Sequence, residues 1–152
     1  MTASNLFSFL RSIPKHPQFS ILLRAKHGVG KSSIIKQFAE EKKLHFIDIR
    51  LGQRDVGDII GFPINEDGKF KHILPELLAP AFNKPSLLFF DELNRGTKDV
   101  QQAVFEIILD RRMNGKILHP ETLIVSAINQ DLNIYSVTDI DPALLSRFCA
   151  HN

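Results

Sequence analysis

The sequence predicts an α/β fold built on a mainly parallel sheet, with one inserted hairpin. Short apolar runs of the kind buried in parallel strands alternate along the chain with segments of helical period. Such an alternation folds through right-handed crossover connections. A turn-rich stretch interrupts it once and predicts the hairpin. The 152 residues are one domain's worth of chain, long enough to bury a sizeable core.

Each element follows from a local pattern. A short amphipathic helix is expected over residues 5–12, ended by the proline-containing stretch 14–17. Apolar runs predict strands at residues 19–23, 87–90 and 123–128, and residues 45–49 are expected to form a further strand. Helices are expected over residues 32–43, over a segment with apolar residues at helical spacing from 100 to 108 and Thr97 as N-cap, and over residues 142–146.

The hairpin is expected between the second and third of these strands. Residues 62–64 and 69–73 flank the turn sequence Asn-Glu-Asp-Gly at residues 65–68. Gly68 can take the positive φ that tight hairpin turns require.

Composition excludes several classes of protein. Hydrophobic residues make up 43% of the chain and charged residues 24%, as in a soluble globular protein. The formal net charge of +2 is too small to indicate nucleic-acid or membrane binding by itself. A single cysteine, Cys149, excludes an internal disulfide and a cysteine-based zinc site, and suits a reducing compartment. We therefore expect a cytoplasmic protein with no membrane segment.

A glycine-rich segment, residues 25–32, joins the first expected strand to the following helix. Its sequence, Ala-Lys-His-Gly-Val-Gly-Lys-Ser, has the context of a phosphate-binding loop at a helix N-terminus. Lys31 would reach the β- and γ-phosphates and Ser32 would ligate Mg²⁺. Ala25 stands where the usual pattern has its first glycine; the alternative is a strand–helix turn with a chance lysine. The residues predicted to bind the nucleotide are Lys26, His27, Gly28, Val29, Gly30, Lys31, Ser32 and Ser33.

Two carboxylates follow the apolar strand 87–90. The carboxyl ends of strands are where open α/β sheets bind ligands. Asp91 would hold Mg²⁺, through water or together with Ser32, and Glu92 would polarise the attacking water. Taken alone this is an acidic strand end, but together with the phosphate loop it indicates nucleotide hydrolysis rather than binding only.

Two further polar residues are candidates with open alternatives. Asn129, at the end of strand 123–128, could orient the water against the γ-phosphate or could cap the next turn. Arg147 could act as an arginine finger in a neighbouring subunit's site, or could form a surface pair.

Taken together, these segments resemble the AAA+ ATPases and, within them, the MoxR-like group, from about Phe19 to the end of the chain. Residues 25–32 resemble Walker A and residues 87–92 resemble Walker B. Other segments are similar to further motifs of the group: residues 91–95 with 100–103 and 109–112, Asn129 at sensor 1, 143–148 around the finger Arg147, and 58–63 at the start of a helix 2 insertion.

The resemblance implies a P-loop NTPase sheet in the order 5-1-4-3-2 and a ring, commonly a hexamer, with ATP and Mg²⁺ bound between subunits. It implies a remodelling chaperone acting on a protein client, often with a von Willebrand factor A-domain partner, and a hairpin that touches the client. Residues 1–152 would then be one AAA+ domain, with 1–18 as an N-terminal helix and linker and 61–73 as the inserted hairpin. We expect the C-terminus to be truncated, so that the fifth strand only begins and the family's helical lid is absent.

Three alternatives belong to other classes. One is a nucleotide-binding scaffold without turnover, because of Ala25 and the expected lack of a lid. Another is a DNA-acting motor, because Lys69, Lys71 and His72 flank Phe70 in the hairpin; the small net charge disfavours it. The third is a small-molecule kinase, but the sequence offers no acceptor-binding motif and leaves Asn129 and Arg147 without a role.

Overall fold

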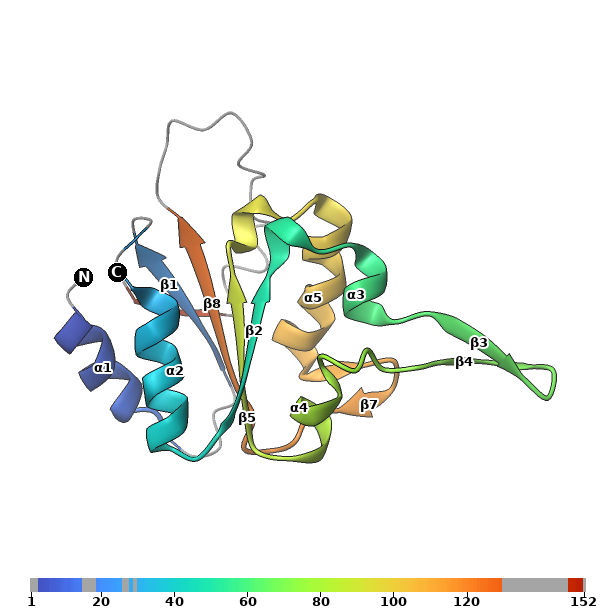
Figure 1. Ribbon diagram of the computed structural model, residues 1–152, viewed down its shortest axis with the longest axis horizontal. Helices are drawn as coiled ribbons and strands as arrows, with labels where there is room; N and C mark the ends of the chain where they lie inside the picture. Colours follow the sequence, from blue (N-terminus) through green and yellow to red (C-terminus); the bar gives the residue numbers. More distant parts are fainter. Residues whose placement is uncertain (1–2, 15–18, 26–27, 29, 130–147, 152) are drawn as a thin grey trace.

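A computed structural model describes residues 3–14, 19–25, 28, 30–129 and 148–151. Its centre is a five-stranded sheet in which all neighbouring strands are parallel (Figure 1). Counting only the strands of this sheet along the chain, the order is the expected 5-1-4-3-2, and the predicted α/β fold is confirmed. From edge to edge the strands are β9 (Phe148–His151), β1 (Ser20–Ala25), β8 (Leu123–Asn129), β5 (Ser86–Asp91) and β2 (His45–Arg50).

Helices cover both faces of the sheet, over two separate apolar layers. Phe89 of β5 is fully buried in one layer and the adjacent Phe90 is fully buried in the other, as side-chain alternation requires. One layer is covered by α1 (Ala3–Arg11) and α2 (Lys31–Glu41), and the other by α3 (Val56–Ile60), α4 (Ala79–Asn83) and α5 (Lys98–Asp110). None of the helices in the described part of the chain is long and apolar enough to cross a membrane.

The expected strands and long helices are present, with ends shifted by a few residues. Thr97 caps α5 as predicted: its Oγ1 accepts a hydrogen bond from the Val100 backbone N–H at 3.3 Å. The fifth strand is already formed over Phe148–His151, where it pairs with β1, although the sequence predicted only its beginning. The helix expected over residues 142–146 lies outside the described residues.

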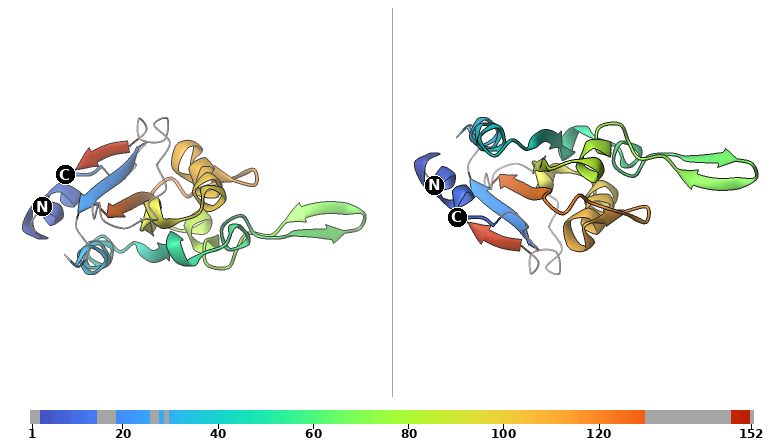
Figure 2. Two further views of the ribbon diagram at one scale, coloured as in Figure 1. Left: turned by 90° about the horizontal axis from the view of Figure 1, so that it is seen from above. Right: turned by 90° about the horizontal axis from the view of Figure 1, so that it is seen from below.

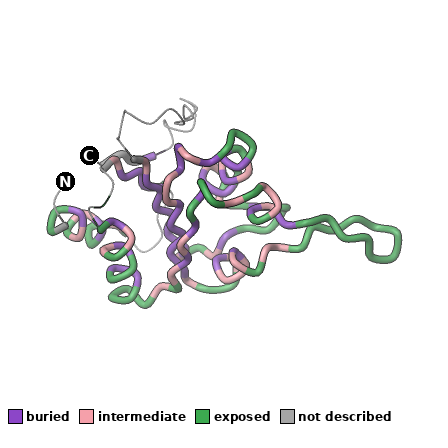
Figure 3. The backbone as a smooth tube through the Cα atoms, turned by 45° about the horizontal axis from the view of Figure 1, so that its top comes forward, coloured by how far each residue is buried: buried purple, intermediate pink, exposed green. Residues whose placement is uncertain are grey.

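The inserted hairpin consists of β3 (Pro63–Glu66) and β4 (Lys69–His72) and follows α3. It extends away from the body in both views of Figure 2, and its residues are exposed (Figure 3). Only Asp67 and Gly68 form the turn, with φ of 53° and 77°. Positive φ at both positions defines a type I′ turn. The four-residue turn predicted over 65–68 was therefore too long, because its first two residues continue the strand.

Sequence analysis missed a second, smaller hairpin, formed by β6 (Arg112–Met113) and β7 (Lys116–Ile117). Its turn is Asn114–Gly115, an Asn-Gly pair, which is a strong sequence signal for a two-residue turn. The Asn114 amide donates a hydrogen bond to the Ile60 carbonyl at 2.8 Å. This bond ties the small hairpin to the end of α3, next to the point where the long hairpin begins.

Candidate active site

A polar cleft of about 510 Å³ opens at the carboxyl ends of the strands, where open α/β sheets bind ligands. The glycine-rich loop after β1, the N-terminus of α2, and the ends of β2 and β5 contribute its walls. Its lining residues are Gly28, Gly30, Lys31, Ser32, Ser33, Arg50, Gln53, Asp91, Glu92 and Arg95.

The glycine loop ends in a helix N-terminus without a side-chain cap. Gly30 is the N-cap of α2, with φ of 74°, and Gly28 has φ of 81°. An added Cβ at either glycine would meet no atom within 4 Å. Glycine is therefore required by backbone conformation, and the space beside the loop is open. The first amides of α2 and this open space suit an anion such as a phosphate.

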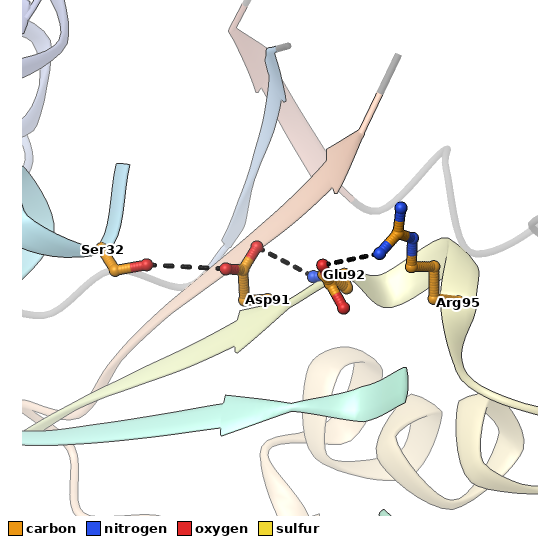
Figure 4. A network of polar contacts seen from close by, with 4 residues as sticks. All are labelled: Ser32, Asp91, Glu92 and Arg95. Atoms are coloured by element: carbon orange, nitrogen blue, oxygen red, sulfur yellow. Dashed lines mark hydrogen bonds and ion pairs between the residues drawn. The ribbon is translucent and has the colours of Figure 1, made fainter. Parts of the chain in front are cut away.

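The loop contributes a cation and a hydroxyl at the start of α2. Lys31 is only 6% exposed and lines the cleft. Ser32 Oγ lies 3.5 Å from Asp91 Oδ2, so the start of α2 meets the end of β5 (Figure 4). Asp91 faces α2 because it follows Phe89 by two residues in the strand.

The other oxygen of Asp91, Oδ1, accepts a hydrogen bond from the Glu92 backbone N–H at 2.9 Å. This bond fixes the carboxylate toward Ser32. Two oxygen ligands of one octahedral Mg²⁺ lie about 3 Å apart, close to the spacing of this pair. The donor set of Ser32 and Asp91 therefore fits the predicted magnesium ion.

Glu92 is held by its backbone and by a neighbour. It has φ of 55° and ψ of 41°, a left-handed conformation uncommon outside glycine, and precedes the single turn η2 (Leu93–Arg95). Its Oε1 accepts a hydrogen bond from Arg95 Nη1 at 3.1 Å, and its side chain is 15% exposed. The backbone of Gly52 packs against the pair: a Cβ there would lie 3.3 Å from Glu92 Oε2.

Sequence analysis missed three polar residues of this cleft: Arg50, Gln53 and Arg95. Arg50 ends β2, and Gln53 ends the 3₁₀ turn η1 (Leu51–Gln53) that follows it. The signal for Arg50 was its place directly after the strand expected over residues 45–49, the same place that drew attention to Asp91 on its own strand.

A buried carboxylate, Asp48, lies on β2 near this cleft. Its Oδ1 has no hydrogen-bond partner within the described residues. Burial raises the pKa of Asp48; the Arg50 charge opposes that rise and the Asp91 charge adds to it. Asp48 faces the same layer as Asp91, because both alternate with residues of the opposite layer.

The remaining predicted site residues are only partly described. Asn129 is the last residue of β8, opposite Ala25 in the register with β1, at the same sheet edge as Asp91. Lys26, His27, Val29 and Arg147 lie outside the described residues. Among the side chains that the structure does describe, no three of the types His, Cys, Asp and Glu gather as a metal site.

The family model described as "ATPase family associated with various cellular activities (AAA)" matches residues 21–151. The chain belongs to the AAA family. The matched family is one of ATPases, which agrees with the predicted enzyme class, and the cleft lies at the expected end of the sheet. AAA proteins bind ATP, usually with Mg²⁺, which agrees with the donor set at Ser32 and Asp91.

One solved structure similar to this AAA domain is that of a protein from Cytophaga hutchinsonii described as a candidate ATPase. The two share 21% sequence identity at a TM-score of 0.63, which shows a common fold. The alignment covers 98% of this chain and 46% of the other, so the chain spans about half of that protein's length. No curated protein matches the sequence significantly.

Proposed function

We propose that this chain is the nucleotide-binding domain of a MoxR-like AAA+ ATPase that assembles into a ring, commonly a hexamer, and remodels a protein client. The observation that carries the hydrolytic part is the 3.5 Å approach of Ser32 Oγ to Asp91 Oδ2. It joins the phosphate loop and the acidic strand end in one cleft. A cytoplasmic location stays a prediction of the sequence.

Within the cleft, each residue has a defined task. The uncapped amides of α2 and the Lys31 ammonium group would hold the phosphates. Ser32 and Asp91 would ligate Mg²⁺, which supplies charge neutralisation on the phosphate oxygens. Glu92, held by Arg95, would orient the attacking water and accept its proton.

Assembly would complete the site. Asn129 at the sheet edge would orient the water from the β8 side, and Arg147 would reach the γ-phosphate of a neighbouring subunit. The support for this part is the order of the motifs along the chain. A von Willebrand factor A-domain protein is the partner that the MoxR-like resemblance suggests.

The long hairpin is the proposed contact with the client. Phe62 is 70% exposed and Phe70 is 77% exposed, so the hairpin presents large apolar side chains to solvent. Lys71 forms an ion pair with Glu66 at 2.5 Å, which offsets part of the basic charge expected to attract DNA. This observation favours a protein client over a nucleic acid.

Steady-state phosphate release, measured over a range of protein concentrations, tests the proposal. Activity should rise faster than linearly with concentration, and Lys31→Ala and Glu92→Gln should abolish it. Arg147→Ala should be inactive alone but should recover activity when mixed with Lys31→Ala, because each variant supplies what the other lacks. Tight ATP binding without phosphate release at any concentration would instead identify a nucleotide-binding scaffold.

A further inference from the structure

Arg50 is a cation that lines the nucleotide cleft, and its charge acts on the buried carboxylate of Asp48. It is the exposed last residue of β2 and lines the cleft together with Ser32 and Asp91. Within the described residues it forms no hydrogen bond and no ion pair with any side chain.

Two carboxylates that neighbour Arg50 in the sheet, Asp91 and Asp48, form no hydrogen bond or ion pair with it within the described residues. Asp91 is directly opposite Arg50 in the register of β2 and β5, a placement in which opposite charges usually attract. The oxygens of Asp91 are directed instead to Ser32 and to the Glu92 backbone N–H. Asp48, two residues before Arg50, keeps a buried Oδ1 with no hydrogen-bond partner in the described part of the chain. Since neither carboxylate receives a bond from it, the guanidinium remains available to a ligand.

The charges of the cleft show which ligand suits it. Its described cationic residues are Lys31, Arg50 and Arg95, and its acidic residues are Asp91 and Glu92. Arg95 is paired with Glu92. With Asp91 assigned to the magnesium ion, Arg50 is the cation of this lining that the described residues leave for the ligand. A triphosphate carries more negative charge than a diphosphate, so this cation suits the additional phosphate.

The position of Arg50 in the sheet also favours a contact with the additional phosphate of a triphosphate. Ser32 and Asp91 mark where the magnesium ion and the phosphates that it bridges would lie. Arg50 belongs to the strand next to Asp91, on the side away from β8. A nucleotide bound there would present the metal end of its phosphate chain to Arg50, and the amides of α2 would hold the phosphates closer to the loop. An arginine can bind one phosphate through two parallel hydrogen bonds.

We propose that Arg50 binds the terminal phosphate of ATP from within the same subunit and makes the cleft prefer ATP over ADP. The inference rests on the proposed ATP site in this cleft and adds a recognition residue to it. Arg50 would stabilise the bound triphosphate before any neighbouring subunit contributes.

Calorimetric titration with ADP and with the non-hydrolysable β,γ-imido analogue of ATP tests this. The variants are Arg50→Ala, Arg50→Lys and a matched control, Arg112→Ala, which removes an exposed arginine on β6. Arg50→Ala should weaken binding of the triphosphate analogue by about ten- to a hundredfold, the usual effect of losing one charge-assisted hydrogen-bonded contact. It should leave the Kd for ADP within about twofold. Arg50→Lys should restore part of the loss and Arg112→Ala should change neither Kd.

If Arg50 served folding alone, Arg50→Ala would weaken the binding of ADP and of the analogue equally, and this result would overturn the inference. An unchanged Kd for the analogue would also overturn it. Circular dichroism melts of each variant identify any loss of fold. Failure of the proposed function looks different, because the wild-type protein would then bind neither nucleotide and Lys31→Ala would have no effect.

Discussion

Arg95 and Glu92 form an ion pair across the single turn that follows β5, with Nη1 of the arginine 3.1 Å from Oε1 of the glutamate. Figure 4 shows the pair continuing a line of contacts from Ser32 through Asp91. Glu92 already has an uncommon left-handed backbone. A neighbouring side chain thus directs the carboxylate for which we propose the role of activating water.

Arg95→Ala should therefore lower kcat by about tenfold while the KM for ATP changes little, because Arg95 positions the base without touching the phosphates. Arg95→Lys should keep part of the activity, since a lysine can retain the charge but not the same geometry. Steady-state kinetics on both variants give the two constants separately. A rise in kcat for Arg95→Ala would mean that the ion pair withholds Glu92, contrary to this account.

Asp91→Asn should make nucleotide binding much less dependent on Mg²⁺. The variant keeps the shape of the side chain but loses the charge that faces Ser32 Oγ. Titrating ATP at several Mg²⁺ concentrations should show a loss of about tenfold or more in affinity at saturating Mg²⁺, and a much smaller difference from wild type in EDTA. An equal loss in both conditions would argue against a metal role for Asp91.

The same substitution, Phe to Ala, should affect the free energy of unfolding very differently at the buried Phe89 and at the exposed Phe70. Phe89 is fully buried between the sheet and α2, so Phe89→Ala should lower the free energy of unfolding by about 3–5 kcal/mol. Phe70 is 77% exposed on the hairpin, and Phe70→Ala should change that free energy by less than about 0.5 kcal/mol. Urea denaturation measures both. A large loss of stability for Phe70→Ala would show that the hairpin packs against the domain.

The base of the hairpin depends on Gly61. Its φ of 74° and ψ of −172° are available only to glycine, and an added Cβ would lie 1.9 Å from the Ile73 carbonyl oxygen. Gly61→Ala should therefore destabilise the protein by about 2 kcal/mol or more. Gly68→Ala, at a turn position with positive φ but open space, should cost about 1 kcal/mol. Thermal melts of the two variants should differ in that order; equal melting temperatures would refute it.

Local patterns in the sequence predicted most of the sheet, because buried parallel strands such as 87–90 are short apolar runs that need no partner to be recognised. The order of the strands came from the family resemblance, since periodicity carries no information on which strands are neighbours. The extent of the hairpin turn was misjudged at residues 65–66, where strand pairing overrides a turn-forming sequence.

The polar residues around the candidate site were harder to predict. Motif spacing led to Ser32 and Asp91, because the phosphate loop and the acidic strand end each have a recognisable context. Arg50 directly follows an expected strand, but a single basic residue there is no motif, and its place in the cleft depends on the register that sets β2 beside β5. Arg95 is three residues from Glu92, but their pairing depends on the left-handed turn at Glu92, which nothing in the local sequence requires.

Single-turnover hydrolysis tests the central claim most directly. With protein in excess over radiolabelled ATP, at concentrations that favour assembly, the wild-type protein should convert bound ATP to ADP. Glu92→Gln should bind the same amount of ATP and convert it at least about a hundredfold more slowly, because it keeps the binding cleft and loses the base. Bound ATP that stays intact on the wild-type protein, or a Glu92→Gln variant as fast as wild type, would contradict the account.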